Sequence, residues 1–192
     1  MSTVMAVPSI SETGRTFRLT RAHVAVLLEA GLVEQARYEL LNGVLVEKMP
    51  QNKPHVSSCR RTTHALEDRF GRDRVGAQAP IVLDDLNEPE PDVFVTRLPL
   101  EDYPDNPPAS EVLLVVEVAD AALRTDRTDK AESYARSGIP EYWVVDVNGR
   151  RVIVHREPAS DGYCFVNTLN ETDSISPLHA EAQVLDVRDL LP

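Results

Sequence analysis

The sequence predicts a single α/β domain, in which helices flank a mixed β-sheet in an α+β arrangement. A buried strand, a helix and a second apolar strand follow one another between residues 112 and 147, the order expected of a strand, helix, strand unit. Asn-Gly pairs stand between apolar segments at two places, and each pair predicts a β-hairpin. The chain has 192 residues, of which 42% are hydrophobic, and can therefore bury a sizeable core without disulfides or metals.

The N-terminal part is expected to form a short helix followed by a hairpin. Thr20 is suited to cap the helix, whose apolar pattern ends at Gly31. Residues 38–41 and 44–47 are apolar segments on either side of Asn42-Gly43, a residue pair that favours a type I′ turn.

A second helix and two strands are expected next. Between residues 54 and 70, side chains suited to a buried face recur three and four positions apart, and Gly71 supplies the stop. Residues 75–83 alternate apolar with other residues, as a half-buried strand does, and residues 92–96 form another strand after a proline-rich turn. Residues 98–110 are rich in proline and acidic residues, which predicts an exposed loop.

The following segment contains the most apolar strand of the chain. Residues 112–118 read VLLVVEV and predict a buried central strand. A helix is expected from residue 125 or 126 to about residue 137, where Gly138 ends it, and residues 141–147 are apolar again.

Asn148-Gly149 then opens the second hairpin. Its return runs through residues 152–154, and residues 163–169 continue the same antiparallel pattern. We assign no element to residues 184–191.

The charge of the chain weighs against a nucleic-acid partner, because phosphate recognition draws most of its affinity from lysine and arginine. The formal net charge is −11. Arginines nevertheless crowd one region and would give a locally positive field if they shared a face; ordinary solvated surface is the alternative. These arginines are Arg60, Arg61, Arg69, Arg72 and Arg74.

Cellular location and boundaries follow from simple features. No apolar stretch is long enough to cross a bilayer, and the first residues lack a basic segment followed by an apolar one, so we expect a cytoplasmic protein with no membrane partner. Cys59 and Cys164 show no metal-binding spacing and are expected to be reduced. We place the domain at residues 16–192 and expect residues 1–15 to be flexible.

Glu117 is the residue with the clearest chemical signal, since an ionised side chain inside an apolar strand needs a partner or a function. Asp92 stands at the start of another strand, and carboxylates at matching heights on adjacent strands can ligate one hard cation such as Mg²⁺. The carbonyl of Val118 is a further oxygen ligand of the right kind. A buried ion pair for Glu117, and a turn or edge position for Asp92, are the structural alternatives.

Lys130 lies on the helix expected after the Glu117 strand. Its ammonium would orient or deprotonate a water molecule, or neutralise charge that develops on a phosphate. A surface ion pair with Asp126, four residues earlier, is the structural alternative.

Several segments together resemble the Uma-type restriction endonuclease family. They are YELLNG at residues 38–43, His55 at the start of a helix, EPDV at 90–93, LVVEV at 114–118, the helix with Lys130 and Tyr134, and YARSGIPEYWVVD at 134–146. The resemblance covers residues 16–190, and the last of these segments is the most distinctive.

The resemblance implies a PD-(D/E)xK nuclease core, a mixed sheet flanked by helices whose acids bind Mg²⁺ or Mn²⁺. Asp92 and Glu117 match the two acids. Ala119 stands where the usual lysine would be, and Lys130 takes that role from the next helix. Glu39 and His55 match further family positions; we include His55 among the catalytic candidates, whereas for Glu39 we slightly favour a hairpin-face residue.

The function expected is therefore Mg²⁺-dependent hydrolysis of phosphodiester bonds in DNA by a homodimer, since two-fold symmetry suits the cutting of two strands. The alternative is a catalytically inactive interaction or scaffold module that keeps the nuclease fold, which the acidic charge and the missing lysine encourage. Hydrolysis of a smaller phosphate ester is a third option.

Overall fold

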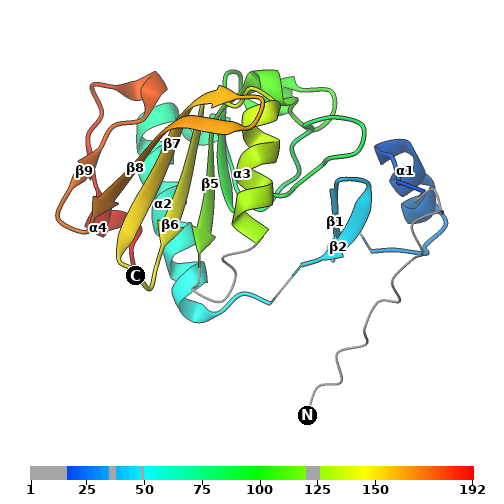
Figure 1. Cartoon of the computed structure of the whole chain (residues 1–192), viewed down its shortest axis with the longest axis horizontal. Coiled ribbons are helices and arrows are strands. Elements are labelled where there is room, and N and C mark those ends of the chain that lie inside the picture. The colour runs from blue at the N-terminus through cyan, green and yellow to red at the C-terminus, as the bar shows by residue number, and fades with distance from the viewer. Residues whose placement is uncertain (1–16, 35–37, 49, 120–125) are drawn as a thin grey trace, which may run out of the picture.

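A six-stranded mixed β-sheet forms the centre of the computed structural model, which describes residues 17–34, 38–48, 50–119 and 126–192 (Figure 1). Across the sheet the strands are β3 (Val75–Gly76), β4 (Val93–Thr96), β5 (Val112–Ala119), β6 (Glu141–Asp146), β7 (Arg151–Ala159) and β8 (Gly162–Asn170). Only β5 and β6 pair in parallel. The predicted mixed sheet is confirmed. Residues 1–15, expected to be flexible, lie outside the described residues.

Strand β5 is buried on both sides of the sheet, which explains its apolar sequence. Val116 and Val118 join a core that also contains Trp143 of β6. The side chains that alternate with these two along β5 face the other side of the sheet, where Val115 and Ala119 pack in a second core. Because strand side chains alternate, Glu117 points to this second side together with Val115 and Ala119.

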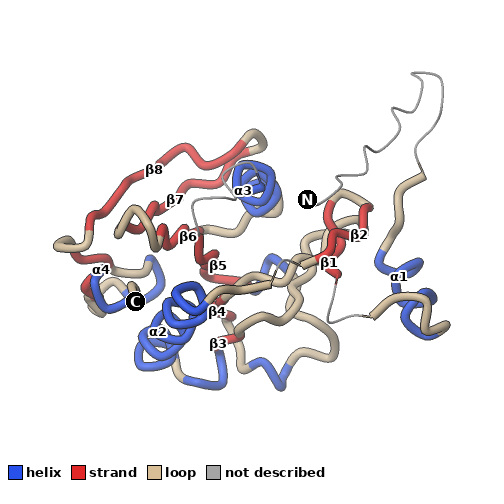
Figure 2. The backbone as a smooth tube through the Cα atoms, turned by 90° about the horizontal axis from the view of Figure 1, so that it is seen from below, coloured by secondary structure: helices blue, strands red, loops and turns tan. Residues whose placement is uncertain are grey.

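Two helices cover opposite sides of the sheet, as Figure 2 shows. Helix α2 (Lys53–Phe70) packs with Leu66 and Phe70 against the core that contains Trp143. Helix α3 (Asp126–Arg136) contributes Tyr134 to the second core and contacts β7 and β8. α2 begins one residue earlier than predicted, because Asn52 caps it by accepting the N–H of His55 at 3.0 Å.

The N-terminal helix and hairpin form as the sequence predicts, and they lie beside the main sheet (Figure 1). Thr20 caps α1 (Arg21–Glu29), and His23 completes the capping box. Strands β1 (Tyr38–Leu41) and β2 (Val44–Glu47) pair antiparallel. Asn42 and Gly43 have φ of 51° and 75°, the positive values that a type I′ turn requires.

The strand predicted over residues 75–83 is wrong beyond Gly76. Gln78 has a φ of 52°, and its N–H bonds the carbonyls of Pro91 and Asp92, so the chain leaves the sheet there. Gly76 pairs with Phe94, whose ring would lie 2.1 Å from any β-carbon at residue 76. The alternation of apolar and other residues over residues 77–83 therefore belongs to an irregular segment and not to a strand.

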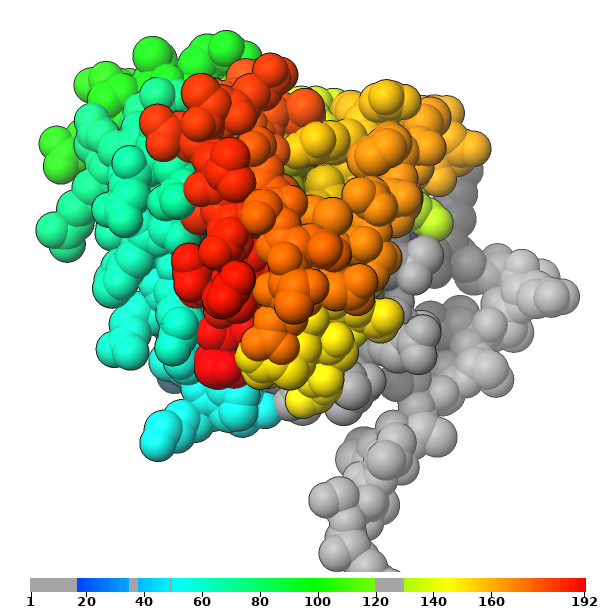
Figure 3. Space-filling view, turned by 90° about the vertical axis from the view of Figure 1, so that its left-hand side faces the viewer, coloured from blue at the N-terminus to red at the C-terminus, as the bar shows by residue number. Residues whose placement is uncertain are grey.

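The C-terminal segment, to which the sequence assigned no element, closes the side of the molecule that α2 covers. It contains β9 (Ser174–Ile175), β10 (Leu185–Asp186) and α4 (Val187–Leu190). Ser58 of α2 donates to the Leu190 carbonyl at 2.6 Å. In Figure 3 this segment, in red, lies between α2 in teal and the β7–β8 hairpin in yellow and orange.

No helix in the described parts of the chain is long and apolar enough to span a lipid bilayer.

The fully buried carboxylate of Glu141 connects the C-terminal segment to the sheet. Glu141 accepts hydrogen bonds from Arg156, from the Trp143 indole at 2.9 Å and from the Leu178 N–H at 2.8 Å. Arg156 also donates to the Ser176 carbonyl at 2.7 Å. Glu141 therefore joins β6 and β7 to the C-terminal segment.

Replacing Glu141 should destabilise the protein strongly, because Arg156 would lose its carboxylate in a largely dry site. We expect Glu141→Ala to lower the free energy of unfolding by about 3–5 kcal/mol, measured by urea unfolding followed by circular dichroism. The matched control is Glu132→Ala, which removes an exposed contact of 3.9 Å with Arg136. The control should change stability by less than about 1 kcal/mol; equal effects of the two variants would contradict the structural role of Glu141.

Candidate functional site

A cavity of about 440 Å³ lies where the hairpin, the start of α2, the segment before β4, the end of β5 and helix α3 meet. It brings together every site residue that the sequence predicts. The acidic and basic side chains of its described lining are five carboxylates, two lysines and a histidine: Glu39, Glu47, Glu90, Asp92, Glu117, Lys48, Lys130 and His55. The lining is therefore rich in negative charge.

Asp92 is fixed by the pairing of β4 with β5. Val93 stands opposite Val116, so the same antiparallel register brings Asp92 next to Glu117, and the N–H of the following residue, Val118, donates to Asp92 Oδ2 at 2.8 Å. His55 Nε2 lies 3.1 Å from the same oxygen. Among the described residues, the one hydrogen-bond contact of the other oxygen, Oδ1, is a long one of 3.5 Å with the Gln51 amide. Oδ1 is thus the oxygen more available to a ligand.

Glu117 projects from β5 into the same cavity and is held from α3. Its Oε1 accepts the Tyr134 hydroxyl at 2.8 Å and Lys130 Nζ at 3.2 Å. Burial raises the pKa of Glu117 to about 7, Lys130 opposes this, and the negative charges of Asp92 and Glu39 add to it. The two acids are therefore close enough to repel each other, which is the environment that a bound cation relieves.

Lys130 lies between two carboxylates. Its Nζ is 3.2 Å from Glu117 Oε1 and 3.2 Å from Glu39 Oε2. Burial lowers the pKa of Lys130, but the attraction of Glu117 and Glu39 and the hydrogen bonds to both outweigh it, so the pKa is raised. Lys130 is thus a permanent ammonium, which favours the charge-neutralising and orienting roles over the removal of a proton.

His55 is held against Asp92 at the start of α2. Burial lowers its pKa, whereas the hydrogen bond and charge of Asp92, the charge of Glu117 and a backbone hydrogen bond at Val118 raise it more strongly. The net pKa is raised, which favours the imidazolium. Val118, expected to offer its carbonyl, also lines the cavity.

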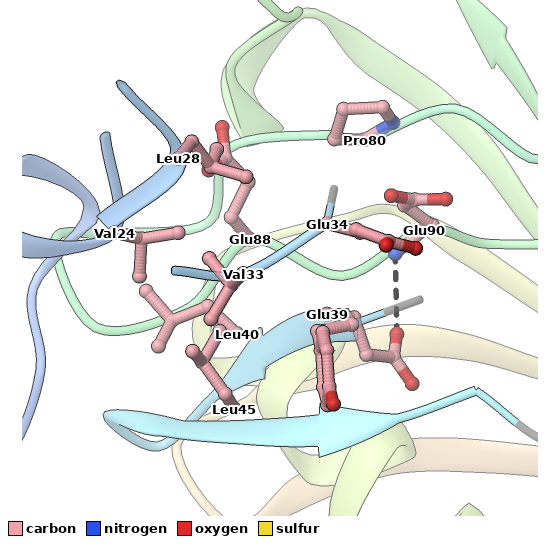
Figure 4. Close-up of a pocket in the computed structure, with 11 residues that line it drawn as sticks. Val24, Leu28, Val33, Glu34, Glu39, Leu40, Leu45, Pro80, Glu88 and Glu90 are labelled. Carbon is pink, nitrogen blue, oxygen red and sulfur yellow. Dashed lines mark hydrogen bonds between the residues drawn. The ribbon is translucent and has the colours of Figure 1, made fainter. Parts of the chain in front are cut away.

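Two residues of this site were missed or undervalued by the sequence analysis. Glu39, favoured there as a hairpin-face residue, contacts Lys130 and accepts the N–H of Glu90 at 3.2 Å, the bond drawn in Figure 4. Tyr134 was not assigned to the site. The signal for it is its position four residues after Lys130, which places both on one face of α3.

The arginine cluster considered in the sequence analysis contributes nothing to the lining of this cavity. Arg69 donates to the carbonyls of Ala65 and Val184, and Arg74 donates to that of Thr96. These two side chains therefore serve the fold, whereas Arg60, Arg61 and Arg72 are exposed.

The donor set fits a divalent cation that keeps part of its hydration shell. Within the described residues, no three His, Cys, Asp or Glu side chains form a metal-binding group. Asp92 and Glu117 are hard oxygen donors in an electronegative cavity, and Mg²⁺ is commonly held by one or two carboxylates, with water and substrate phosphates as the other ligands. The residues present are thus consistent with such a site and with no closed cage.

Comparison with known proteins gives one family and a solved structure. The model of the Uma2 family, described as "Putative restriction endonuclease", matches residues 27–188. A crystal structure titled as a putative nuclease belonging to DUF820 from Anabaena variabilis has a TM-score of 0.65 and 17% sequence identity, and covers 84% of this chain and 94% of its own. At this identity the likeness shows the fold. No curated protein sequence matches the chain.

The raised pKa of Glu117 is directly testable in the metal-free protein. We expect its side chain to titrate at about 7, neutral below that pH and ionised above it. Lys130→Met should move the pKa further upward, because the ammonium favours the ionised form. The measurement is ¹³C NMR of the glutamate carboxyl carbons, with Glu117→Gln to assign the signal.

Lys48→Met is the matched control for this titration. Lys48 lines the same cavity but pairs with Glu90, so we expect the Glu117 signal to titrate as in the unmodified protein. An equal displacement in both lysine variants would show that Lys130 has no specific influence on Glu117.

Proposed function

Because the chain belongs to the Uma2 family of restriction endonuclease-like proteins, we propose that it is a metal-dependent endonuclease that hydrolyses phosphodiester bonds of DNA through a PD-(D/E)xK-type site. The observation that carries the proposal is the meeting of Asp92 and Glu117 in one cavity, with Lys130 bound to Glu117. Mg²⁺ or Mn²⁺ is the proposed ion, and homodimerisation, which would pair two such sites, remains a prediction.

The two acids have distinct roles in this proposal. Asp92 and Glu117 would hold the cation, which would polarise a phosphoryl oxygen and lower the pKa of the attacking water. Asp92 offers Oδ1, since its Oδ2 is occupied by the Val118 N–H and His55. Tyr134 and Lys130 both contact Oε1 of Glu117 and so orient this carboxylate.

Lys130 acts as a cation beside the reacting phosphate. The ammonium stabilises negative charge that develops on the phosphoryl oxygens, the usual task of such a group in phosphoryl transfer. Ala119 occupies the usual position of the superfamily lysine, and the contact of Lys130 with Glu117 supports the transfer of that role to α3. His55 holds Asp92 through Nε2 and, as an imidazolium, would offset part of the negative charge of the two acids.

Plasmid nicking tests the proposed function. With Mg²⁺ or Mn²⁺, the protein should convert supercoiled plasmid to open circles, and chelation by EDTA should stop the reaction. Asp92→Asn and Glu117→Gln should each reduce the rate by about 10³-fold or more, because each variant removes a carboxylate from the cation site. Circular dichroism checks that both variants fold.

Glu132→Gln, an exposed substitution on α3, is the control and should leave nicking unchanged. Equal nicking by the control and by the two site variants would identify a contaminating nuclease. It would thereby favour the inactive scaffold module over the enzyme.

A substitution of Lys130 tests whether this residue serves catalytic turnover and not the binding of the metal. Lys130→Met should lower the rate of nicking by about 10²-fold or more, since the transition state loses a cation, while Mn²⁺ binding measured by calorimetry stays detectable. Lys48→Met, which changes a lysine paired with Glu90 in the same cavity, should reduce the rate far less. Full turnover by Lys130→Met would remove this residue from the mechanism.

A further inference from the structure

The hairpin that forms one wall of the site carries apolar side chains on both of its faces. On one face Leu40 and Leu45 stand opposite each other and, with Val24 and Leu28 of α1, line a small pocket of about 40 Å³ (Figure 4). This face is therefore turned towards α1. Strand side chains alternate, so the neighbouring residues point the other way.

The second face of the hairpin looks into the large cavity. Its cross-strand pairs are Leu41 with Val44 and Glu39 with Val46, and all four residues line the cavity. Val44 is 56% exposed and Val46 is 38% exposed. A hairpin with one covered face ordinarily carries polar residues on its other face. The valines thus form an uncovered apolar wall in the same cavity as the acids.

The cationic groups of the cavity are already engaged with its carboxylates. Lys130 pairs with Glu39 and Glu117, Lys48 pairs with Glu90, and His55 pairs with Asp92. Binding of a nucleic-acid duplex draws largely on lysine and arginine contacts to many phosphates. This lining offers few such contacts, and the net charge of −11 opposes a duplex further. The affinity of this site for a nucleic acid must therefore come mainly from contacts other than ion pairs with the phosphate backbone.

We infer that the site takes a nucleotide whose base is unpaired, with the base against Val44 and Val46 and its phosphate at the divalent cation that Asp92 and Glu117 would hold. This inference rests on the proposed nuclease function and adds the class of substrate. The volume of about 440 Å³ lies within the range of roughly 300–1,000 Å³ that small-molecule sites occupy. Enzymes that read an unstacked base pack its faces between aromatic or apolar side chains, and the valine wall supplies one such surface.

Three labelled DNA substrates of one sequence test the inference: a single strand, a full duplex, and a duplex with a central unpaired loop. With Mn²⁺ we expect cuts in the single strand and within the loop. The paired regions should be cut at about one tenth of that rate or more slowly still, because a paired base must first be unstacked. The position of each cut is mapped by gel electrophoresis.

Two wall variants test the contact itself on the single strand. Val44→Ser and Val46→Ser should each raise KM by about five- to tenfold through lost apolar contact, with kcat little changed. Val166→Ser on β8 is the matched control, because Val166 is 55% exposed, close to the 56% of Val44, and lies outside the cavity lining. It should leave both constants unchanged, and circular dichroism verifies folding.

The outcomes distinguish the two levels of the proposal. Equal cutting of duplex and single strand, or an unchanged KM in both wall variants, would overturn the inference. Cleavage that still required Asp92 would then leave the nuclease function standing. Absence of metal-dependent cleavage from all three substrates would reject the proposed function, and the inference with it.

Discussion

The hydrogen bond from the Val118 N–H to Asp92 Oδ2 is the constraint on which the site depends. It joins the residue before β4 to the residue that follows Glu117 on β5, and so holds the two acids in one cavity at a shared strand boundary. β5 is buried on both faces and pairs with β6, which leaves its backbone little freedom to shift. A buried sheet of this kind is a suitable base for a site whose ligands must keep sub-ångström positions.

The acids themselves are an unfavourable arrangement without a cation. Burial and the mutual repulsion of Glu117, Asp92 and Glu39 oppose ionisation of Glu117, and Lys130 offsets only part of this. The Tyr134 hydroxyl adds a hydrogen bond to the same carboxylate. Every polar member of such a network matters, because an unsatisfied group in a dry site costs more than its partner contributes. The unfavourable burial of these carboxylates occurs in a cavity, where a bound ligand can relieve the repulsion. Elsewhere the sheet is packed with apolar side chains.

The site combines two supports with different physical character. The sheet and α3 supply Asp92, Glu117 and Lys130 from well-packed elements. The β1–β2 hairpin lies outside the six-stranded sheet and brings Glu39 together with its apolar wall. Its other face is turned towards α1 across a small pocket, and α1 has no buried residue among those described. The chemistry is therefore held by the core, whereas the surface that would meet a substrate is carried by a smaller unit at its side.

By itself, the sequence determined the features that depend on neighbouring residues: the Asn42-Gly43 turn, the Thr20 cap of α1, the Gly71 stop of α2, and a carboxylate inside an apolar strand. Residues 75–83 were misread because alternation is blind to the positive φ of Gln78 and to the loop carbonyls that hold it. Only the tertiary structure decided that Glu39 meets Lys130. These two residues lie far apart in the chain, and their contact exists because the hairpin and α3 converge on one cavity, which no local pattern encodes.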